Sequence, residues 1–402
     1  MQITSHTARL WILVVIVAIS GFSQGMLLPL LAVIFEQQGV SSSVNGLHAT
    51  ALYIGILLAS PFMEKPLRAF GYKPLIVTGG AVVISSLALF PVWESFWFWF
   101  ALRLLIGIGD NMLHFGTQTW ITSFSPVEKR GRNISLYGLF FGLGFALGPF
   151  MVPLVEWNAN APFWISAALS LFAWLGIWFL ANERPQVEQE EVATLGIRGT
   201  FHRFGSVTRI AWIAFLPPFG YGFLEASING NFPVYALRQG FSVEYVSYVL
   251  LPAFVIGGII TQIPLGVLSD RLGRLPILRI ALSGGTLFFI LSSFVEEIPW
   301  LFGACFFVAG MFIGSSFSLG ISYMTDLVPP SLLPAGNILC GAFFSFGSMT
   351  GPFIGGILIE LFPELPFTLL LGGMLGLIFL CLQFGQTQVR TSSASAGSQA
   401  KG

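Results

Sequence analysis

Four polar side chains share one face of a long apolar stretch, and their types suit the binding and transfer of protons. Arg103, Asp110, His114 and Gln118 lie within residues 97–123. At 100° per residue these positions fall within about 80° of one another, so a helix presents them as one stripe. An ionisable side chain at bilayer depth costs at least about 2.5–3.5 kcal/mol unless it faces a partner or water. The stripe therefore predicts a polar site that faces inward.

Asp110 is our first choice for a carboxylate that binds and releases a proton. Arg103 lies roughly 10.5 Å away along the same helix, at 1.5 Å per residue, which is too far for direct contact. His114 is one turn from Asp110, and we expect it to stabilise the charged carboxylate or to relay its proton. Glu225, near the centre of a later apolar stretch, is our second choice. The alternative is a static buried network that only fixes helix packing.

Three other apolar stretches carry polar faces compatible with this stripe. Tyr221, Glu225 and Asn229 follow one another at helical spacing, as do Ser318 and Ser322 in a later stretch. A polar face in each stretch suits helices that surround a shared wet space. The predicted substrate-cavity residues are Gln24, Gln118, Tyr221, Asn229, Ser318 and Ser322.

The elements that position these residues are expected to be membrane-spanning helices. The chain is 55% hydrophobic and 9% charged, against about 25% charged for a soluble domain. Its mean hydropathy is +0.82. Only helices satisfy their own backbone within such spans of about 20 residues. We predict twelve spans, at residues 10–35, 45–63, 74–92, 97–123, 134–155, 162–181, 208–236, 243–268, 276–295, 299–325, 337–360 and 366–385.

The basic residues are distributed asymmetrically between these spans. Sixteen of the 18 Lys and Arg residues lie at the two ends of the chain or in alternate gaps, while the intervening gaps hold only Arg238 and a span holds Arg103. Positive loops stay on the cytoplasmic side of a membrane, so both termini are predicted to be cytoplasmic. We expect a multi-pass protein of the cell membrane, and the zero net charge argues against nucleic acid as a partner.

The two halves of the chain repeat one another. Gly-Leu-Gly-Phe-Ala-Leu-Gly-Pro-Phe ends at Phe150, and Phe-Gly-Ser-Met-Thr-Gly-Pro-Phe ends at Phe353, 203 residues later. Loop glycines Gly71 and Gly273 repeat at nearly the same offset. We therefore predict an N-terminal six-helix bundle at 1–181, a cytoplasmic linker at 182–207, a C-terminal bundle at 208–387 and a disordered tail at 388–402, with the substrate site between the bundles.

The segment after the eighth span resembles a signature of the major facilitator superfamily. Gly266-Val-Leu-Ser-Asp270-Arg271-Leu-Gly273-Arg274 is similar to the family's loop G-x-x-x-D-R-x-G-R. The resemblance covers the whole chain except the tail, and it implies the twelve-helix, two-bundle fold of that family. It also implies that these five positions act as a cytoplasmic gate. The alternative is a cluster of solvated charges that only anchors the topology.

The equivalent loop of the first half departs from the family's pattern. Arg68 stands where the acidic residue belongs, and Glu64 replaces the first glycine. The role of the signature therefore cannot be transferred to this loop. If a latch exists here, its charges are rearranged.

Two further motifs resemble those of proton-coupled exporters in the family. Arg103-Leu-Leu-Ile-Gly107-Ile-Gly109 is similar to R-x-x-x-G-x-G, which is associated there with proton coupling, so Arg103 joins Asp110, His114 and Glu225 as a proton-coupling candidate. Gly144-Phe-Ala-Leu-Gly148-Pro149 is similar to the antiporter-linked G-x-x-x-G-P. Small residues four apart allow close helix contact, and proline permits a kink. The predicted packing and kink residues are Gly144, Gly148, Pro149, Gly347, Gly351 and Pro352.

These observations favour a secondary active transporter that exports small amphipathic or hydrophobic compounds against protons by alternating access. The alternatives are a proton symporter for a small organic solute, a lipid flippase, and a membrane scaffold that transports nothing. The sequence has no metal-ligand cluster, nucleophile elbow or phosphate-binding loop, so we expect neither an enzyme nor a cofactor. The expected partners are a small-molecule substrate, protons and the lipid bilayer, and we expect a monomer.

Overall fold

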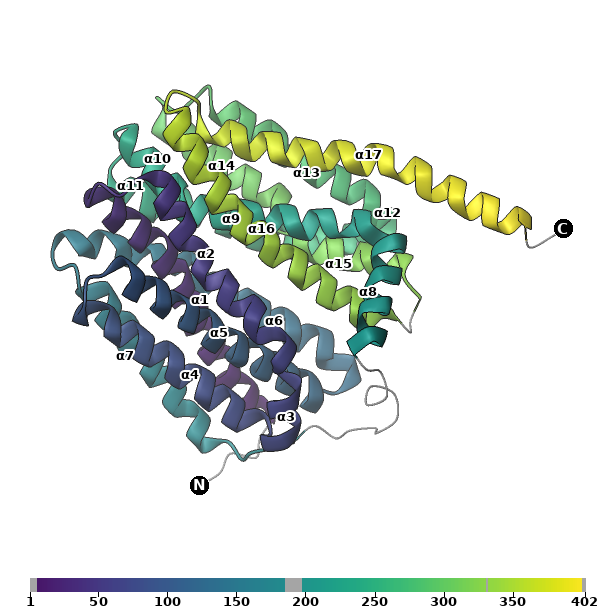
Figure 1. The fold of residues 1–402 in the computed structure, drawn as a ribbon, viewed down its shortest axis with the longest axis horizontal. Helices are drawn as coiled ribbons and strands as arrows, with labels where there is room; N and C mark the ends of the chain where they lie inside the picture. The colour runs from purple at the N-terminus through teal and green to yellow at the C-terminus, as the bar shows by residue number, and fades with distance from the viewer. Residues whose placement is uncertain (1–5, 185–196, 330–331, 400–402) are drawn as a thin grey trace. The chain divides into compact units, whose positions relative to one another are not determined.

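The computed structural model describes residues 6–184, 197–329 and 332–399, and these ranges fold into helices joined by short loops (Figure 1). The α-helices of the first half are α1 (His6–Gln37), α2 (Ser42–Ala59), α3 (Glu64–Phe70), α4 (Tyr72–Leu89), α5 (Phe96–Phe124), α6 (Val127–Leu147) and α7 (Ala161–Leu175). Those of the second half are α8 (Ile197–Ala211), α9 (Leu216–Gly230), α10 (Phe232–Arg238), α11 (Val243–Tyr245), α12 (Leu251–Leu272), α13 (Arg274–Ser292), α14 (Pro299–Ile313), α15 (Ser316–Leu327), α16 (Leu333–Leu361) and α17 (Phe367–Gln399).

Short segments of tighter or wider helix extend or connect these elements. The tighter 3-10 segments are η1 (Ser60–Phe62), η2 (Phe90–Val92), η3 (Gly148–Glu156), η4 (Gly176–Phe179) and η5 (Trp212–Phe215). A π-helical segment, η6 (Val246–Leu250), joins α11 to α12. At Gly148 and Pro149, where a kink is predicted, α6 is followed directly by the tighter η3. Pro352, by contrast, lies inside the continuous helix α16.

Eleven helical stretches of the described chain are long and apolar enough to cross a membrane. The missing member is the predicted seventh span, which the structure divides into η5, α9 and α10. α9 ends at Gly230, and α10 starts afresh at Phe232 with Pro233 in its first turn. Proline lacks a backbone N–H and suits the first turn of a new helix better than the interior of an old one. The all-helical fold is therefore confirmed, with one span built from two shorter helices.

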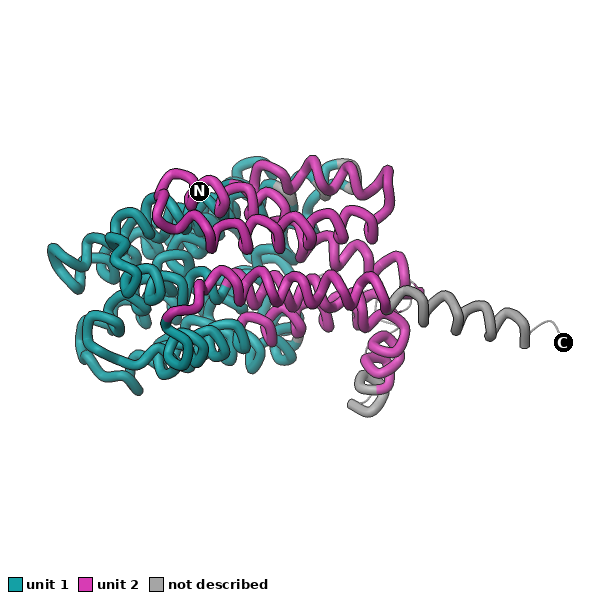
Figure 2. Tube along the Cα trace, turned by 90° about the horizontal axis from the view of Figure 1, so that it is seen from above, with its two compact units in different colours: residues 1–188, 226–256, 349–363 teal, residues 189–225, 257–348, 364–402 magenta. Residues whose placement is uncertain are grey.

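The chain forms two compact units, which Figure 2 colours separately. Unit 1 contains residues 1–188, 226–256 and 349–363, and unit 2 contains residues 189–225, 257–348 and 364–402. Unit 1 thus holds the N-terminal spans together with one end of the seventh, eighth and eleventh spans. The bundle boundaries at 181 and 208 stay predictions. So does the disordered tail from 388, because the side chains of 385–399 and all of 400–402 lie outside the described residues.

Glycines bring α1 and α6 into backbone contact in unit 1. A Cβ added at Gly144 would overlap the carbonyl oxygen of Ala18, and one at Gly21 would overlap that of Phe141. Gly148 likewise faces the backbone at Gly25. Because only hydrogen fits at these points, the sequence places small residues four apart on both helices.

The same arrangement recurs in unit 2, between α9 and α16. A Cβ at Gly347 would overlap the carbonyl oxygen of Phe219, and one at Gly222 would overlap that of Phe344. Gly351, one turn beyond Gly347, is buried. Gly144, Gly148 and Gly347 of the repeated motif thus lie at close helix contacts.

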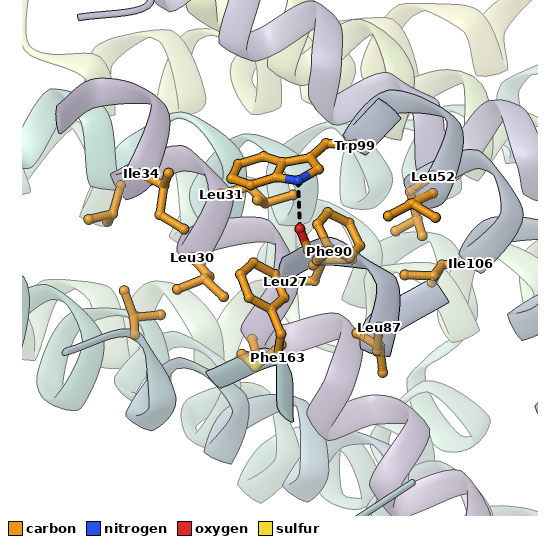
Figure 3. Close-up of a cluster of buried hydrophobic side chains, with 14 of the residues drawn as sticks. Leu27, Leu30, Leu31, Ile34, Leu52, Leu87, Phe90, Trp99, Ile106 and Phe163 are labelled. Carbon is orange, nitrogen blue, oxygen red and sulfur yellow. Dashed lines mark hydrogen bonds between the residues drawn. The ribbon is translucent and has the colours of Figure 1, made fainter. Parts of the chain in front are cut away.

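An aromatic and aliphatic core fills unit 1 at the ends of α1 and α5 (Figure 3). Trp99 on α5 donates its indole N–H to the carbonyl oxygen of Phe90, 3.0 Å away. The Phe90 ring stacks on Phe163 of α7 with centroids 4.9 Å apart. Leu27, Leu30, Leu31 and Ile34 supply the α1 side of this core. Because the indole N–H of Trp99 keeps a hydrogen bond, burying this ring in the core costs little free energy.

Candidate functional site

Asp110 lies in the interior of unit 1, where α5 meets α1. Its side chain is 1% exposed. Ser20 on α1 donates its hydroxyl to Asp110 Oδ1 at 2.8 Å. The other oxygen, Oδ2, is buried and has no hydrogen-bond partner among the described residues. A carboxylate with one buried oxygen left unpaired is costly in its charged form, because that form loses the most solvation. This group is therefore suited to gaining and losing a proton.

His114 extends the polar contacts of Asp110 along the same face of α5. Its Nε2 lies 3.1 Å from Ser20 Oγ and 3.2 Å from Gln24 Nε2. Its Nδ1 lies 2.5 Å from the hydroxyl of Tyr137 on α6. We call Ser20, Gln24, Asp110, His114 and Tyr137 the buried polar cluster. The structure therefore unites three residues predicted for two different roles, namely Asp110, His114 and Gln24.

Tyr137 was missed as a functional residue by the sequence-based reasoning, and Ser20 was not chosen from the polar face of its span. A signal for Tyr137 does exist in the chain. It lies two helical turns before Gly144, so it shares the face of α6 that contacts α1. The partner of its hydroxyl, His114, lies on the neighbouring helix α5.

Arg103 does not join the buried polar cluster. Its Nη1 lies 3.0 Å from Nδ1 of His48 on α2, and His48 Nε2 lies 3.3 Å from the carbonyl oxygen of Phe96. Arg103 is 1% exposed, and its Nε and Nη2 have no hydrogen-bond partner among the described residues. The shared stripe on α5 thus serves two separate contacts, one to α2 and one to α1. Gln118, at the far end of the stripe, is exposed.

The residues predicted for the cavity in the second half lie in their own local settings. Tyr221, on α9, has ring contacts with Phe317 and Phe344 in unit 2, and Glu225 on the same helix is half-buried there. Asn229 is buried in unit 1. On α15, Ser318 and Ser322 each donate to a carbonyl of their own helix. Their predicted part in substrate binding stays a prediction.

The loop predicted as the cytoplasmic gate ties together three helices of unit 2. Arg274, at the start of α13, forms an ion pair with Asp270 on α12, and its Nε lies 3.8 Å from Asp326 Oδ2 at the end of α15. Gly273 between them has φ of 94°, which favours glycine. Arg271 is exposed, and Gly266 has space around it. The signature therefore cross-braces its own half, while its role as a gate stays a prediction.

The first half builds a comparable brace with different residues. Gly71 has the same φ of 94°. No aspartate follows α2, but Glu183, just beyond the sixth span, accepts bonds of 2.8 Å from both Arg9 on α1 and Trp120 on α5. Its carbonyl also accepts the backbone N–H of Tyr72 at 2.9 Å. Glu183 is thus the centre of this brace.

The ends of several helices from both sequence halves meet within unit 1, at the end opposite the basic loops. Arg238 on α10 pairs with both oxygens of Glu36 on α1, at 2.7 and 3.0 Å. Asn231 donates to the carbonyl of Pro352 on α16, at 3.1 Å. We call these contacts the outer seam, after the side that the charge distribution predicts. Its residues are Glu36, Ser42, Ser43, Gly46, Asn231, Arg238, Pro352, Gly356 and Glu360.

Glycines again set the closest approach within this seam. A Cβ at Gly46 on α2 would overlap the carbonyl oxygen of Pro352, and one at Gly356 would overlap that of Ser42. The lone basic residue of the intervening gaps, Arg238, thus belongs to a contact between segments some 200 residues apart in sequence. Pro352 acts here as a hydrogen-bond acceptor, in addition to the predicted packing role.

No group of three or more His, Cys, Asp or Glu among the described residues is arranged to hold a metal ion. The titratable groups of unit 1 instead form the pairs and short chains described above. Such an arrangement suits proton transfer and ion pairing.

Comparison with known proteins places the chain among transporters. Residues 13–259 and 248–400 match the Major Facilitator Superfamily. The uncharacterized MFS-type transporter YfkF of Bacillus subtilis (strain 168) is 55% identical over 376 residues, which cover 94% of this chain and 95% of YfkF. Multidrug resistance protein 1 of the same organism is 25% identical over 356 residues, which cover 85% and 87% of the two chains.

Solved structures share the fold at low sequence identity. The nucleoside transporter NupG superimposes with a TM-score of 0.76 at 14% identity, covering 93% of this chain and 99% of NupG. The human organic anion transporter MFSD10 (TETRAN) does so with a TM-score of 0.70 at 17% identity, covering 94% and 100%. At these identities the likeness concerns the fold alone. Together with the family match and the relative at 55% identity, it leads to one conclusion. The chain belongs to the Major Facilitator Superfamily and is a multi-pass membrane transporter, not an enzyme.

Proposed function

We propose that this transporter exports small amphipathic or hydrophobic compounds in exchange for protons. The observation that carries the proposal is Asp110: a carboxyl group 1% exposed, bonded through one oxygen to Ser20 and unpaired at the other. A carboxylate in this position is retained at a cost of at least about 2.5–3.5 kcal/mol. A proton-binding role explains that cost, because the group is neutral during part of the cycle.

Two further observations support export of apolar compounds. Relatives over most of the chain include Multidrug resistance protein 1, 25% identical, and Multidrug resistance protein 2, 21% identical, both of Bacillus subtilis (strain 168). The close packing of α1 on α6 through the glycines of the antiporter-like motif gives the motif a physical role next to Asp110. Glu225, half-buried on α9, is the second proton-carrying candidate.

Proton movement driven by a substrate gradient tests the proposal directly. The purified protein is placed in liposomes that contain a pH-sensitive dye, and a panel of lipophilic cations and neutral amphipathic compounds, beginning with ethidium, is added outside. If the protein exchanges compound for protons, protons leave the liposome as the compound enters. At least one compound of the panel should therefore raise the internal pH. Movement of protons in the same direction as the compound would instead indicate symport.

Two variants assign the proton to a residue. Asp110→Asn keeps the size of the side chain but cannot bind the proton, so we expect it to lose the pH change while still exchanging labelled for unlabelled compound across the membrane. Glu225→Gln is the parallel variant for the second candidate. An Asp110→Asn protein that moves protons at the normal rate would contradict the assignment, and a protein that exchanges no compound of the panel would contradict the proposed substrate class.

A further inference from the structure

We propose that Ser20, His114 and Tyr137 form a proton relay that loads and unloads Asp110, and that the His114 tautomer follows the protonation of Asp110. The proposal deepens the proposed function and rests on it for its role in transport. The geometry is a continuous chain of polar contacts across three helices: 2.8 Å from Asp110 Oδ1 to Ser20 Oγ, 3.1 Å on to His114 Nε2, and 2.5 Å from Nδ1 to the Tyr137 hydroxyl.

When Asp110 is ionised, the direction of every bond in the chain is fixed. A carboxylate only accepts, so Ser20 donates its single hydroxyl proton to Asp110. Ser20 Oγ then has only acceptor capacity left toward His114, whose Nε2 must carry the hydrogen. A neutral imidazole carries one hydrogen, so Nδ1 accepts the hydroxyl proton of Tyr137. Gln24 Nε2 lies 3.2 Å from His114 Nε2, and two donors cannot face each other, so in this state the Gln24 amide must turn its oxygen toward Nε2–H.

When Asp110 is protonated, every direction reverses. The carboxyl group now donates to Ser20 Oγ, and Ser20 donates onward to His114 Nε2. The imidazole hydrogen then lies on Nδ1 and is donated to the Tyr137 oxygen. Gln24 Nε2, 3.2 Å from His114 Nε2, supports this arrangement as a second donor. The two states differ in the tautomer of His114 and in the orientation of the Gln24 amide, while the heavy atoms of Ser20, Asp110, His114 and Tyr137 stay in place.

One proton passes along the chain without a net charge on Ser20, His114 or Tyr137 at the end. The O–H bond of Tyr137 breaks as Nδ1–H forms, Nε2–H breaks as a new O–H forms on Ser20, and the original O–H of Ser20 breaks as the carboxyl O–H of Asp110 forms. The Tyr137 oxygen takes its replacement from a hydrated proton. Of the two ends of the chain, Tyr137 is the more accessible to water, at 8% exposed against 1% for Asp110, and the half-buried His114 lies between them.

The side chains around the relay include few other groups that titrate. The α1 side supplies Ser20 and Gln24, which do not titrate, and α6 supplies Tyr137. α4 faces α5 near Asp110 with Gly79 and Val83. On the α2 side, His48 is bonded to Arg103 instead of to the cluster. Among the described contacts, His114 and Tyr137 are thus the titratable groups joined to Asp110.

Nitrogen NMR of histidine-labelled protein tests the proposal without any substrate. The chain has four histidines, and the His114 signals are identified as those lost in His114→Gln. Titration of Asp110 is followed in parallel through the infrared band of its protonated carboxyl group, identified by its loss in Asp110→Asn. We expect the hydrogen to move from Nε2 to Nδ1 over the pH range in which that band appears. One tautomer throughout that range would overturn the proposal.

Hydroxyl variants separate a relay from a merely structural contact. Ser20→Ala should uncouple the two signals, so that Asp110 still titrates while His114 no longer follows, and Ser20→Thr should restore the coupling. Ser23→Ala is the matched control, because Ser23 bonds to Ser166 and Ser170 on α7 and not to the cluster. Coupling that persists in Ser20→Ala would overturn the proposal, and the wild-type titration decides alone if this variant does not fold.

Transport measurements give the relay a second readout. Positioned acids and bases typically contribute 10²–10⁴-fold to proton transfer, so Tyr137→Phe should slow substrate-driven proton flux roughly 10²-fold while leaving exchange of labelled compound unchanged. Equal slowing of both would overturn the relay. If the wild type moves no protons with any compound but the tautomer follows Asp110, the relay stands and the proposed export function fails, so the two failures are distinguishable.

Discussion

Replacement of Gly46 by alanine should open the outer seam. A methyl group at this position of α2 would overlap the carbonyl oxygen and carbon of Pro352 on α16. Both are backbone atoms, and Asn231 holds the same carbonyl by a hydrogen bond of 3.1 Å. They cannot rotate away as a side chain would. The overlap is therefore relieved only by separating α2 from α16.

The size of the effect follows from the cost of overpacking. An extra methyl group in a packed interior costs typically about 1–3 kcal/mol. We call the seam closed when α2 and α16 are in contact and open when they are separated. If the methyl group costs this free energy only in the closed seam, the ratio of open to closed molecules rises about 5–150-fold. Gly341→Ala is the matched control, because it adds the same methyl group to α16 where no other atom lies within 4 Å. Both variants gain about 1 kcal/mol of helix propensity, so this gain does not explain a difference between them.

Chemical modification of a cysteine within the seam measures the open population. Ser42 is 1% exposed, and its hydroxyl has no partner among the described residues, so Ser42→Cys removes no hydrogen bond seen there. When opening is fast, the rate of alkylation by a membrane-impermeant maleimide is proportional to the open fraction. We expect this rate to rise about 5–150-fold in Gly46→Ala. The measurement uses a protein in which Cys305, Cys340 and Cys381 have been replaced, so that the thiol at position 42 is the one that reacts.

Two results would refute this reasoning. An unchanged alkylation rate in Gly46→Ala would mean that the seam absorbs the methyl group without opening. An equal rise in Gly341→Ala would mean that the effect arises from α16 as a whole and not from its contact with α2. A thermal unfolding curve for each variant shows that the comparison is made between folded proteins.

Three further predictions follow from the charged contacts. Arg238→Gln removes a partly exposed ion pair worth up to about 1 kcal/mol, so the rate of alkylation at position 42 should rise about fivefold or less. High salt should raise the rate similarly in the protein that keeps Arg238. A rise as large as that of Gly46→Ala would contradict the expectation that the ion pair contributes less than the glycine contact. Glu183→Gln should lower the free energy of unfolding in detergent by about 1–3 kcal/mol, because Arg9 and Trp120 both lose a charged acceptor; an unchanged unfolding midpoint would show that the brace is dispensable. Asp110→Asn should retain its folding and compound exchange, and loss of both would show a structural role instead.

Much of the fold could be predicted because hydrocarbon imposes simple rules on a chain. Long apolar stretches, alternating basic gaps and an internal offset of about 203 residues were sufficient to predict a twelve-span, two-half architecture. The helical period also grouped Asp110 with His114 correctly, since residues one turn apart share a face. The break in the seventh span was missed, although Asn231 and Pro233 provide the local signal for a new helix.

The partners of the site residues could not be predicted, because the period of a helix defines a face but not the helix it meets. Arg103 shares a stripe with Asp110, yet it contacts His48 on α2 while Asp110 contacts Ser20 on α1. α5 packs against both neighbours, and a stripe about 80° wide is broad enough to reach each of them. The partners of Glu183 could not be predicted either. Glu183 lies beside the linker, where no helical period assigns it to a face.

The internal repeat itself argues against a purely packing role for Asp110. The close crossing of α1 on α6 recurs as α9 on α16, with glycine against backbone carbonyl in both. The ionisable groups do not recur: at offsets of 202 and 203 residues from Asp110 the chain has Phe312 and Ile313, and Ile313 is fully buried. The position of the second half that is equivalent to Asp110 is therefore apolar, and it avoids the cost of at least about 2.5–3.5 kcal/mol that Asp110 imposes. Since the equivalent position packs without a carboxyl group, we propose that Asp110 is present for what a carboxyl group does and an isoleucine cannot, which is to bind and release a proton.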